Sequence, residues 1–232
     1  MSALALTPLE LEAVTLSLRV ALWCVLLSLV PALLLAWLLA RRDFPGKQLL
    51  NAVVHLPLVL PPVAVGYLLL LLFGHNGPLG AWLERDFGLT VAFTWKGAAI
   101  ASATMGFPLM VRAIRLALEA VDRRLEAAAR TLGARPARVF VTITLPLMVP
   151  GILTGAVLSF ARSLGEFGAT IVFVSNIPGE TRTLPLALYS LTQTPSGDAG
   201  ALRLVVLAFL LALAALVASE LVARRVTARL GL

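Results

Sequence analysis

The chain has 232 residues, of which 59% are hydrophobic and 13% are charged, and its mean hydropathy is +0.95. One soluble core needs far less apolar material, so this composition excludes an ordinary soluble domain and predicts a membrane protein. A net charge of +7 would suit a nucleic-acid-binding protein, but the basic residues lie between apolar stretches, so we expect no nucleic-acid partner.

Five apolar stretches are each long enough to cross a bilayer, which takes about 20 helical residues. They cover approximately residues 13–40, 49–73, 95–117, 147–175 and 201–222. The first is too long for a signal peptide, whose apolar run is ~7–15 residues, and Glu10 and Glu12 stand where such a peptide is basic. We therefore predict an all-α integral membrane protein in which residues 1–232 form one domain with about five transmembrane helices.

The positions of lysine and arginine predict the orientation of these helices, because cytoplasmic loops are enriched in basic residues. With the N-terminus outside, the basic residues of segments 41–47, 112–138 and 224–229 all fall on the cytoplasmic side. The opposite orientation would expose nearly all of them outside. We therefore expect a multi-pass protein of the bacterial inner membrane, surrounded by lipid, with its C-terminus in the cytoplasm.

Prolines at positions 57, 61 and 62 interrupt the second stretch, and each removes a backbone donor, so the helix is expected to kink or break. Such a break can border a transport pathway or can be plain helix curvature.

The polar segment 74–94 is predicted to lie outside, as a connector or as a partner-binding surface. Cys24 is the only cysteine, which excludes an intrachain disulfide, and His55 and His75 lack neighbours at metal-ligand spacing, so no metal site is expected.

A short amphipathic helix is predicted at about residues 121–134, between the third and fourth spans. Val121, Leu125, Ala128 and Leu132 recur at helical spacing, and charged residues occupy the other faces. Gly133 stands where a helix stop is expected. A basic amphipathic helix can lie on the membrane surface, but the run of alanines at 127–129 favours close docking against a protein.

The residues from Glu126 to Gly133 read Glu-Ala-Ala-Ala-Arg-Thr-Leu-Gly, and after nine more residues follows Ile-Thr-Leu-Pro at 143–146. This pattern resembles the EAA signature of ABC importer permeases, and the resemblance implies the type I importer fold and a cytoplasmic coupling helix that docks on an ATPase subunit. The coupling residues that it implies are Glu126, Ala128, Ala129, Gly133, Ile143, Leu145 and Pro146. The usual glutamate lies six residues before the glycine, where this chain has Ala127. The offset turns the Glu126 carboxylate by about 100 degrees around the helix, so the sequence leaves open whether Glu126 forms the family's ion pair.

The fourth stretch carries small residues every fourth position, at Gly151, Gly155, Ser159 and Ser163. Such a stripe favours close helix packing, and the two serine hydroxyls would also suit a route for an oxyanion. Arg162 and Glu166 are four residues apart, so they can pair on a helix, and we interpret that pair as structural. The pathway residues that we predict are Ser159, Ser163, Gly165, Glu166, Phe167 and Gly168.

Residues 160–170 are similar to a stretch shared by molybdate and sulfate permeases, and residues 173–185 are more similar to the molybdate type. The resemblance covers nearly the whole chain and implies a subunit that translocates molybdate inward, with tungstate expected to travel with it. It also implies the partners: a second copy of the chain, two cytoplasmic ABC ATPases and an extracytoplasmic molybdate-binding protein.

The chain has no G-x-x-x-x-G-K-[ST] phosphate loop. We therefore expect no cofactor and no catalytic residue in this chain, with ATP and magnesium bound by the partner ATPase, so that only the assembled complex would be a molybdate-transporting ATPase. The alternatives are a permease for sulfate, thiosulfate or another oxyanion, an ion-gradient-driven anion carrier, and a membrane-embedded enzyme. A carrier usually shows inverted repeats and paired intramembrane charges, and an enzyme shows clustered catalytic side chains; the sequence has neither pattern.

Overall fold

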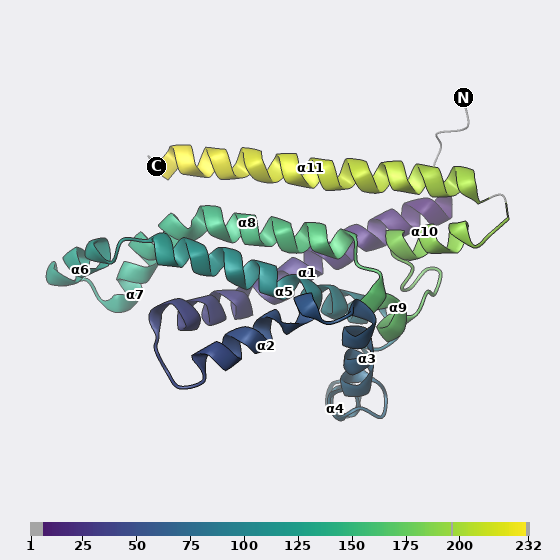
Figure 1. Ribbon diagram of the computed structural model, residues 1–232, viewed down its shortest axis with the longest axis horizontal. Coiled ribbons are helices and arrows are strands. Elements are labelled where there is room, and N and C mark those ends of the chain that lie inside the picture. Colours follow the sequence, from purple (N-terminus) through teal and green to yellow (C-terminus); the bar gives the residue numbers. More distant parts are fainter. Residues whose placement is uncertain (1–6, 196, 231–232) are drawn as a thin grey trace.

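The computed structural model describes residues 7–195 and 197–230, and this part of the chain consists of helices and their connections (Figure 1). For residues 219, 222–224 and 226–230 only the helical backbone is described. Arg224 and Arg229, predicted to be cytoplasmic, are among these, so their side chains lie outside the described set.

Four long apolar helical segments form the bundle, and each is long enough to cross a membrane. They are α1 (Pro8–Arg41), α5 (Trp95–Ala120), α8 (Leu145–Leu164) with the helical turns before it, and α11 (Asp198–Leu230). α5 lies at the centre, because 61% of its apolar window is buried inside the chain, against 6% for α11. Figure 1 shows α1, α5, α8 and α11 running along the same long axis, which agrees with the predicted membrane bundle.

The second predicted span is broken into α2 (Lys47–Val59) and α3 (Pro62–Phe73), which are bent by 113° relative to each other. The two helices count as one span only if the bent pair crosses together, so the bundle has four or five spans. The break lies at Leu60 and Pro61, whose backbones are extended with ψ of 144° and 131°. Both residues precede a proline, which disfavours the helical conformation, so two successive residues leave the helix. Pro57 lies inside α2 and does not break it.

The fourth span differs from the predicted bounds of 147–175. Helical structure begins earlier, with α7 (Pro136–Val139) and a π-helical turn (Phe140–Thr144), and the unbroken run ends at Leu164. Residues 165–167 are not helical and separate α8 from the short α9 (Gly168–Val174), whose Phe173 and Val174 are buried. Apolar content alone does not separate a spanning helix from a short buried one, so the predicted span included both α8 and α9.

Small residues let the central helices approach closely, as expected where helices pack inside a membrane. A Cβ atom added to Gly155 would lie 3.1 Å from the carbonyl oxygen of Met110 on α5, and one on Gly151 would collide with the side chain of Ala117. Gly106 of α5 in turn lies against Ser159. The stripe predicted on the fourth span is therefore the contact surface between α8 and α5.

α6 (Arg123–Thr131) and α10 (Leu184–Thr192) lie at opposite ends of the bundle, and α4 (Pro78–Phe87) lies beyond α3, to one side of the bundle (Figure 1). α6, α7 and the end of α11 share one end in Figure 1, which we call the α6 end, and α9, α10 and the start of α1 share the other, the α10 end. α4 lies within the segment that was predicted to be a polar connector, and α10 was not predicted.

Candidate functional site

α6 is an exposed helix with well-formed caps at both ends, inside the range predicted for the coupling helix. The Asp122 carboxylate accepts a hydrogen bond from the backbone N–H of Arg124 (2.8 Å), which satisfies one free donor of the first turn. At the other end Gly133 has φ +85°, and the N–H groups of Gly133 and Ala134 donate to the carbonyls of Arg130 (2.9 Å) and Ala129 (3.1 Å). This pair of bonds is a Schellman motif, so the glycine is needed for its left-handed backbone.

Three of the four residues of the predicted apolar stripe face away from the rest of the chain, whereas Val121 precedes α6 and is buried in the core. Leu125 is 49% exposed and Leu132 is 88% exposed, and Ala128 between them is also exposed. At about 100° per residue these three side chains point to one face, and Arg123, Glu126 and Arg130 point to the opposite one. An apolar face this exposed on a helix with no buried residue is typical of a surface that docks on a partner.

Glu126 connects α6 to two spanning helices. Its Oε1 accepts hydrogen bonds from Arg41 Nη2 at the end of α1 (2.8 Å) and from Thr144 Oγ1 just before α8 (2.7 Å). The side chains of Arg41 and Glu126 are only 12% and 14% exposed. Despite its offset by one residue, Glu126 therefore does form an ion pair.

The Ile-Thr-Leu-Pro segment forms the junction between α7 and α8. The N–H of Leu145 donates to the carbonyl of Phe140, five residues earlier, and Pro146 occupies the first turn of α8. A proline has no N–H to continue the regular ladder, so a wider π-helical turn precedes it. Ile143, Leu145 and Pro146 are half-buried, and Thr144 is buried with its hydroxyl on Glu126.

Lys47 and Asp43 stabilise the turn between α1 and α2 at this same end, through a hydrogen bond of 2.8 Å. That bond, with smaller contributions from the charges of Lys47 and Arg123, lowers the pKa of the exposed Asp43 carboxyl.

Ser159 and Ser163, predicted for the pathway, lie inside the chain. Ser159 is fully buried, with its hydroxyl 3.4 Å from the Cys24 sulfur on α1, and Ser163 is 6% exposed. Within one copy of the chain these hydroxyls thus contribute to packing among α1, α5 and α8. Their role in a passage remains a prediction.

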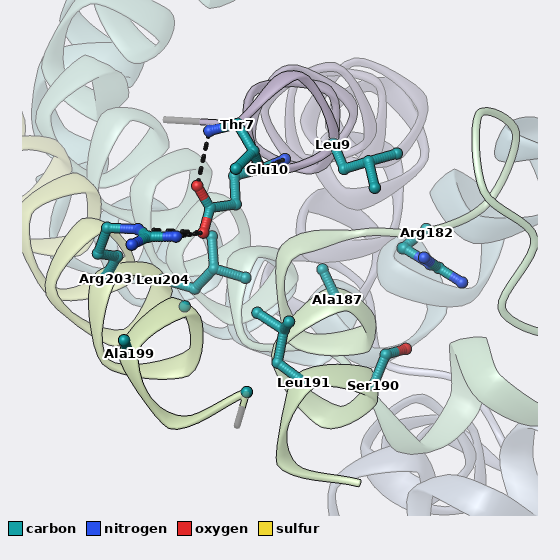
Figure 2. Close-up of a pocket in the computed structure, with 12 residues that line it drawn as sticks. Thr7, Leu9, Glu10, Arg182, Ala187, Ser190, Leu191, Ala199, Arg203 and Leu204 are labelled. Atoms are coloured by element: carbon teal, nitrogen blue, oxygen red, sulfur yellow. Dashed lines mark hydrogen bonds and ion pairs between the residues drawn. The ribbon is translucent and has the colours of Figure 1, made fainter. Parts of the chain in front are cut away.

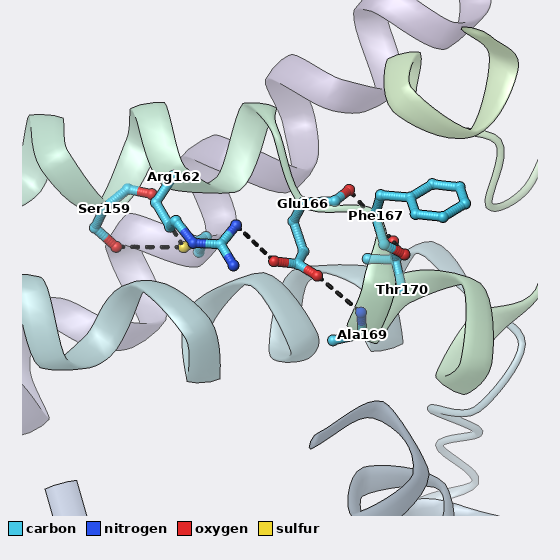
Figure 3. A network of polar contacts seen from close by, with 7 residues as sticks. Ser159, Arg162, Glu166, Phe167, Ala169 and Thr170 are labelled. Atoms are coloured by element: carbon cyan, nitrogen blue, oxygen red, sulfur yellow. Dashed lines mark hydrogen bonds and ion pairs between the residues drawn. The ribbon is translucent and has the colours of Figure 1, made fainter. Parts of the chain in front are cut away.

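The break after α8 holds the other predicted pathway residues, and Figure 3 shows how Glu166 organises it. Its Oε2 lies 2.7 Å from Arg162 Nη1, so the predicted pair is present, although Glu166 follows the end of α8 instead of lying on it. Its Oε1 accepts a hydrogen bond from the N–H of Ala169 (2.8 Å), a donor in the first turn of α9 that would otherwise be free. Glu166 is therefore a buried connector between α8 and α9.

Gly165, Phe167 and Gly168 surround this connector in different ways. A Cβ on Gly168 would lie 2.7 Å from Pro62 Cβ, so this glycine lets α9 approach the start of α3, whereas Gly165 has open space around it. The Phe167 ring contacts that of Tyr189 on α10, with centroids 5.1 Å apart. The glycine-rich turn thus lies where α3, α8, α9 and α10 meet.

A pocket of about 390 Å³ lies at the α10 end, between α1, α10 and α11 (Figure 2). Glu10 is buried in its wall, and its Oε1 accepts hydrogen bonds from Arg203 Nε (3.2 Å) and Nη2 (2.8 Å). Its Oε2 accepts from the Thr7 N–H (2.8 Å), which completes a capping box at the start of α1. The ion pair joins the first and last spanning helices.

The family model described as binding-protein-dependent transport system inner membrane component matches residues 32–228. The chain belongs to this family. The molybdenum transport system permease protein ModB of Escherichia coli K12 is 61% identical to this permease over 226 residues, which are 97% of this chain and 99% of that protein. ModB of Haemophilus influenzae is 56% identical over 223 residues, covering 96% of this chain and 97% of that one.

The permease also shares its fold with solved importers. The structure of a bacterial ABC transporter involved in the import of the acidic polysaccharide alginate superposes with a TM-score of 0.74 at 19% identity, over 96% of this chain and 81% of that one. At this identity the likeness concerns the fold alone, which is that of type I importers as predicted.

Sequence reasoning missed two partners in the permease, Arg41 and Thr144. Arg41 was noted only as a cytoplasmic charge, and Thr144 only as the variable position in Ile-x-Leu-Pro. Both contact Glu126, which is 85 residues from Arg41 and 18 from Thr144. No local pattern predicts a contact over 85 residues, so only the fold reveals it.

Proposed function

We propose that this permease is the membrane-spanning subunit of an ATP-driven importer that moves molybdate, and with it tungstate, into the cytoplasm. The observation that carries the proposal is the likeness to molybdenum transport permeases over almost the whole chain. The exposed apolar face of α6 supports the ATP-driven part, because a coupling helix must present such a face to an ATPase.

Two copies of the chain form the passage, two ABC ATPases dock on the two α6 helices, and an extracytoplasmic binding protein delivers the anion at the α10 end. The orientation follows from charge: segments 41–47 and 112–138, which carry ten Lys and Arg against four Asp and Glu, lie at the α6 end. The N-terminus is thus outside, and ATP and magnesium belong to the ATPase.

The ion pair of Glu126 supplies a mechanical link in this scheme. Closure of the ATPase dimer draws the two α6 helices together. Because Glu126 holds both Arg41 and Thr144, movement of α6 pulls on α1 and on the start of α8 at once. α8 then moves the Glu166 connector and the glycine-rich turn at its other end, and the passage opens outward. Hydrolysis resets the helices.

The docking step is tested by copurifying the permease with its ATPase and comparing Gly133→Trp with Gly133→Asn. Among the described residues no atom lies within 4 Å of a Cβ built at Gly133, so tryptophan has open space there and would protrude into the docked partner. Gly133 has a left-handed backbone conformation, which asparagine adopts more readily than most other residues. Asparagine is also small, so it serves as the control for the bulk of tryptophan. We expect loss of the ATPase with tryptophan and retention with asparagine.

The cargo is tested by uptake of radiolabelled molybdate into proteoliposomes that hold the permease and ATPase, with the binding protein outside. We expect uptake that needs internal ATP, that excess tungstate inhibits, and that excess sulfate leaves unchanged. Inhibition by sulfate as strong as by tungstate would assign the permease to the sulfate type. Uptake on an ion gradient without the ATPase would replace the importer by a carrier.

A further inference from the structure

An open pocket of about 870 Å³ lies at the α6 end, between the last turns of α1, the inner face of α6 and the junction before α8. Its wall on α1 is apolar and is formed by Val30, Leu33, Leu34 and Trp37. These residues lie at helical spacing on one face of α1, opposite the face of Ala32, Ala36 and Leu39 that is buried against the bundle. The pocket therefore opens away from the interior of the subunit.

The mouth of this pocket is strongly basic. Arg42, Arg123 and Arg130 line it and are exposed, and in the described part of the chain their guanidinium groups pair with no carboxylate. The acidic lining residue, Glu126, is already engaged by Arg41 and Thr144. The Arg42 guanidinium lies 5.5 Å from the centre of the Trp37 ring, at the point where the apolar wall meets the basic mouth.

We propose that this pocket binds one anionic phospholipid of the cytoplasmic leaflet, with its phosphate between Arg42, Arg123 and Arg130 and an acyl chain along the apolar face of α1. The volume is within the range of roughly 300–1,000 Å³ of ligand pockets. Guanidinium groups suit a phosphate, and the apolar wall suits a chain that points into the bilayer.

Two other occupants fit the pocket less well. In the proposed function the ATPase docks on the opposite face of α6, which carries the exposed Leu125 and Leu132, and this leaves the pocket side free. A second copy of the chain would bring its own excess of arginine to the same level of the membrane, and like charges would repel. A lipid headgroup instead places a negative charge among the three arginines.

The bound lipid would have a consequence for the proposed transport cycle, although the lipid site itself does not depend on the cargo. Arg123 and Arg130 lie on α6 itself, seven residues apart on one face, and Arg42 lies at the end of α1. A phosphate shared among them adds a second connection between α6 and α1 beside the ion pair of Glu126.

The test uses the full-length permease in nanodiscs and the fluorescence of Trp37, obtained by subtracting the signal of Trp37→Phe. Brominated acyl chains quench a tryptophan on contact, so brominated phosphatidylglycerol and brominated phosphatidylcholine are compared at the same fraction of the bilayer. Each basic group near an anionic surface contributes roughly a fivefold preference. We expect phosphatidylglycerol to quench Trp37 with at least a fivefold higher apparent affinity than phosphatidylcholine.

The variant Arg123→Gln/Arg130→Gln removes two of the three basic groups and should lower this preference at least fivefold. The matched control is Arg124→Gln/Arg138→Gln, which removes the same charge from exposed residues at the same end but outside the pocket. It should keep the preference, which separates a built site from general attraction to a basic surface.

Three results would overturn the proposal. Equal quenching by both lipids in the unaltered permease shows that the pocket does not select an anionic headgroup. Absence of quenching by either lipid shows that a second copy covers the pocket. Loss of quenching when the ATPase is added shows that the ATPase occupies it.

Discussion

The ion pair between Arg41 and Glu126 should hold α6 in place, and the substitution Glu126→Gln tests this directly. Exposed ion pairs contribute about 0–1 kcal/mol and breaking fully buried ones costs about 3–5 kcal/mol. With side chains 12% and 14% exposed, this pair falls between those limits, and we expect a loss of about 2 kcal/mol in the local stability of α6. A loss of that size corresponds to roughly a 30-fold fall in protection from hydrogen exchange.

The assay is hydrogen exchange with mass spectrometry on the peptide of residues 121–134 in nanodiscs. Arg41→Gln should give a similar fall, and the double variant should be little worse than either single one, because both remove the same contact. As a control, Glu119→Gln breaks an exposed pair with Arg115 on the neighbouring helix and should change protection less than about fivefold. Unchanged protection in Glu126→Gln, or fully additive losses in the double variant, would refute the reasoning.

Two further predictions concern stability in detergent, measured by thermal unfolding. Gly66→Ala should destabilise the permease by about 1–3 kcal/mol, because the new Cβ would lie 2.5–3.0 Å from backbone atoms of α9, which cannot move aside. Gly165→Ala is the control: its new Cβ enters open space, so this substitution should be close to neutral. An equal effect of the two substitutions would contradict this packing. Glu10→Gln should destabilise the permease by about 1–3 kcal/mol, because it weakens the buried ion pair with Arg203, whereas the control Glu12→Gln changes an exposed residue and should cost little. If the melting temperature of Glu10→Gln equals that of the unaltered permease, the ion pair adds no stability.

Local signals in the sequence were sufficient for much of the architecture. The apolar stretches predicted a membrane bundle, the stripe and glycine of residues 121–134 predicted a helix that the structure has at Arg123–Thr131, and the spacing of Arg162 and Glu166 predicted their ion pair. These features depend on residues a few positions apart, where the helical repeat and the backbone preferences of glycine dictate the geometry.

The tertiary structure decided what those signals left open. Pro31, Pro57, Pro108 and Pro150 all lie inside helices, whereas the adjacent prolines at positions 61 and 62 force two successive residues out of the helix. The stripe of small residues on α8 packs against α5, where Gly106 lies opposite Ser159. Glu126 contacts Arg41, 85 residues away in the sequence, because the fold places α6 beside the end of α1. A sequence by itself determines the period and caps of each helix, whereas the partner of each face depends on how all the helices pack together.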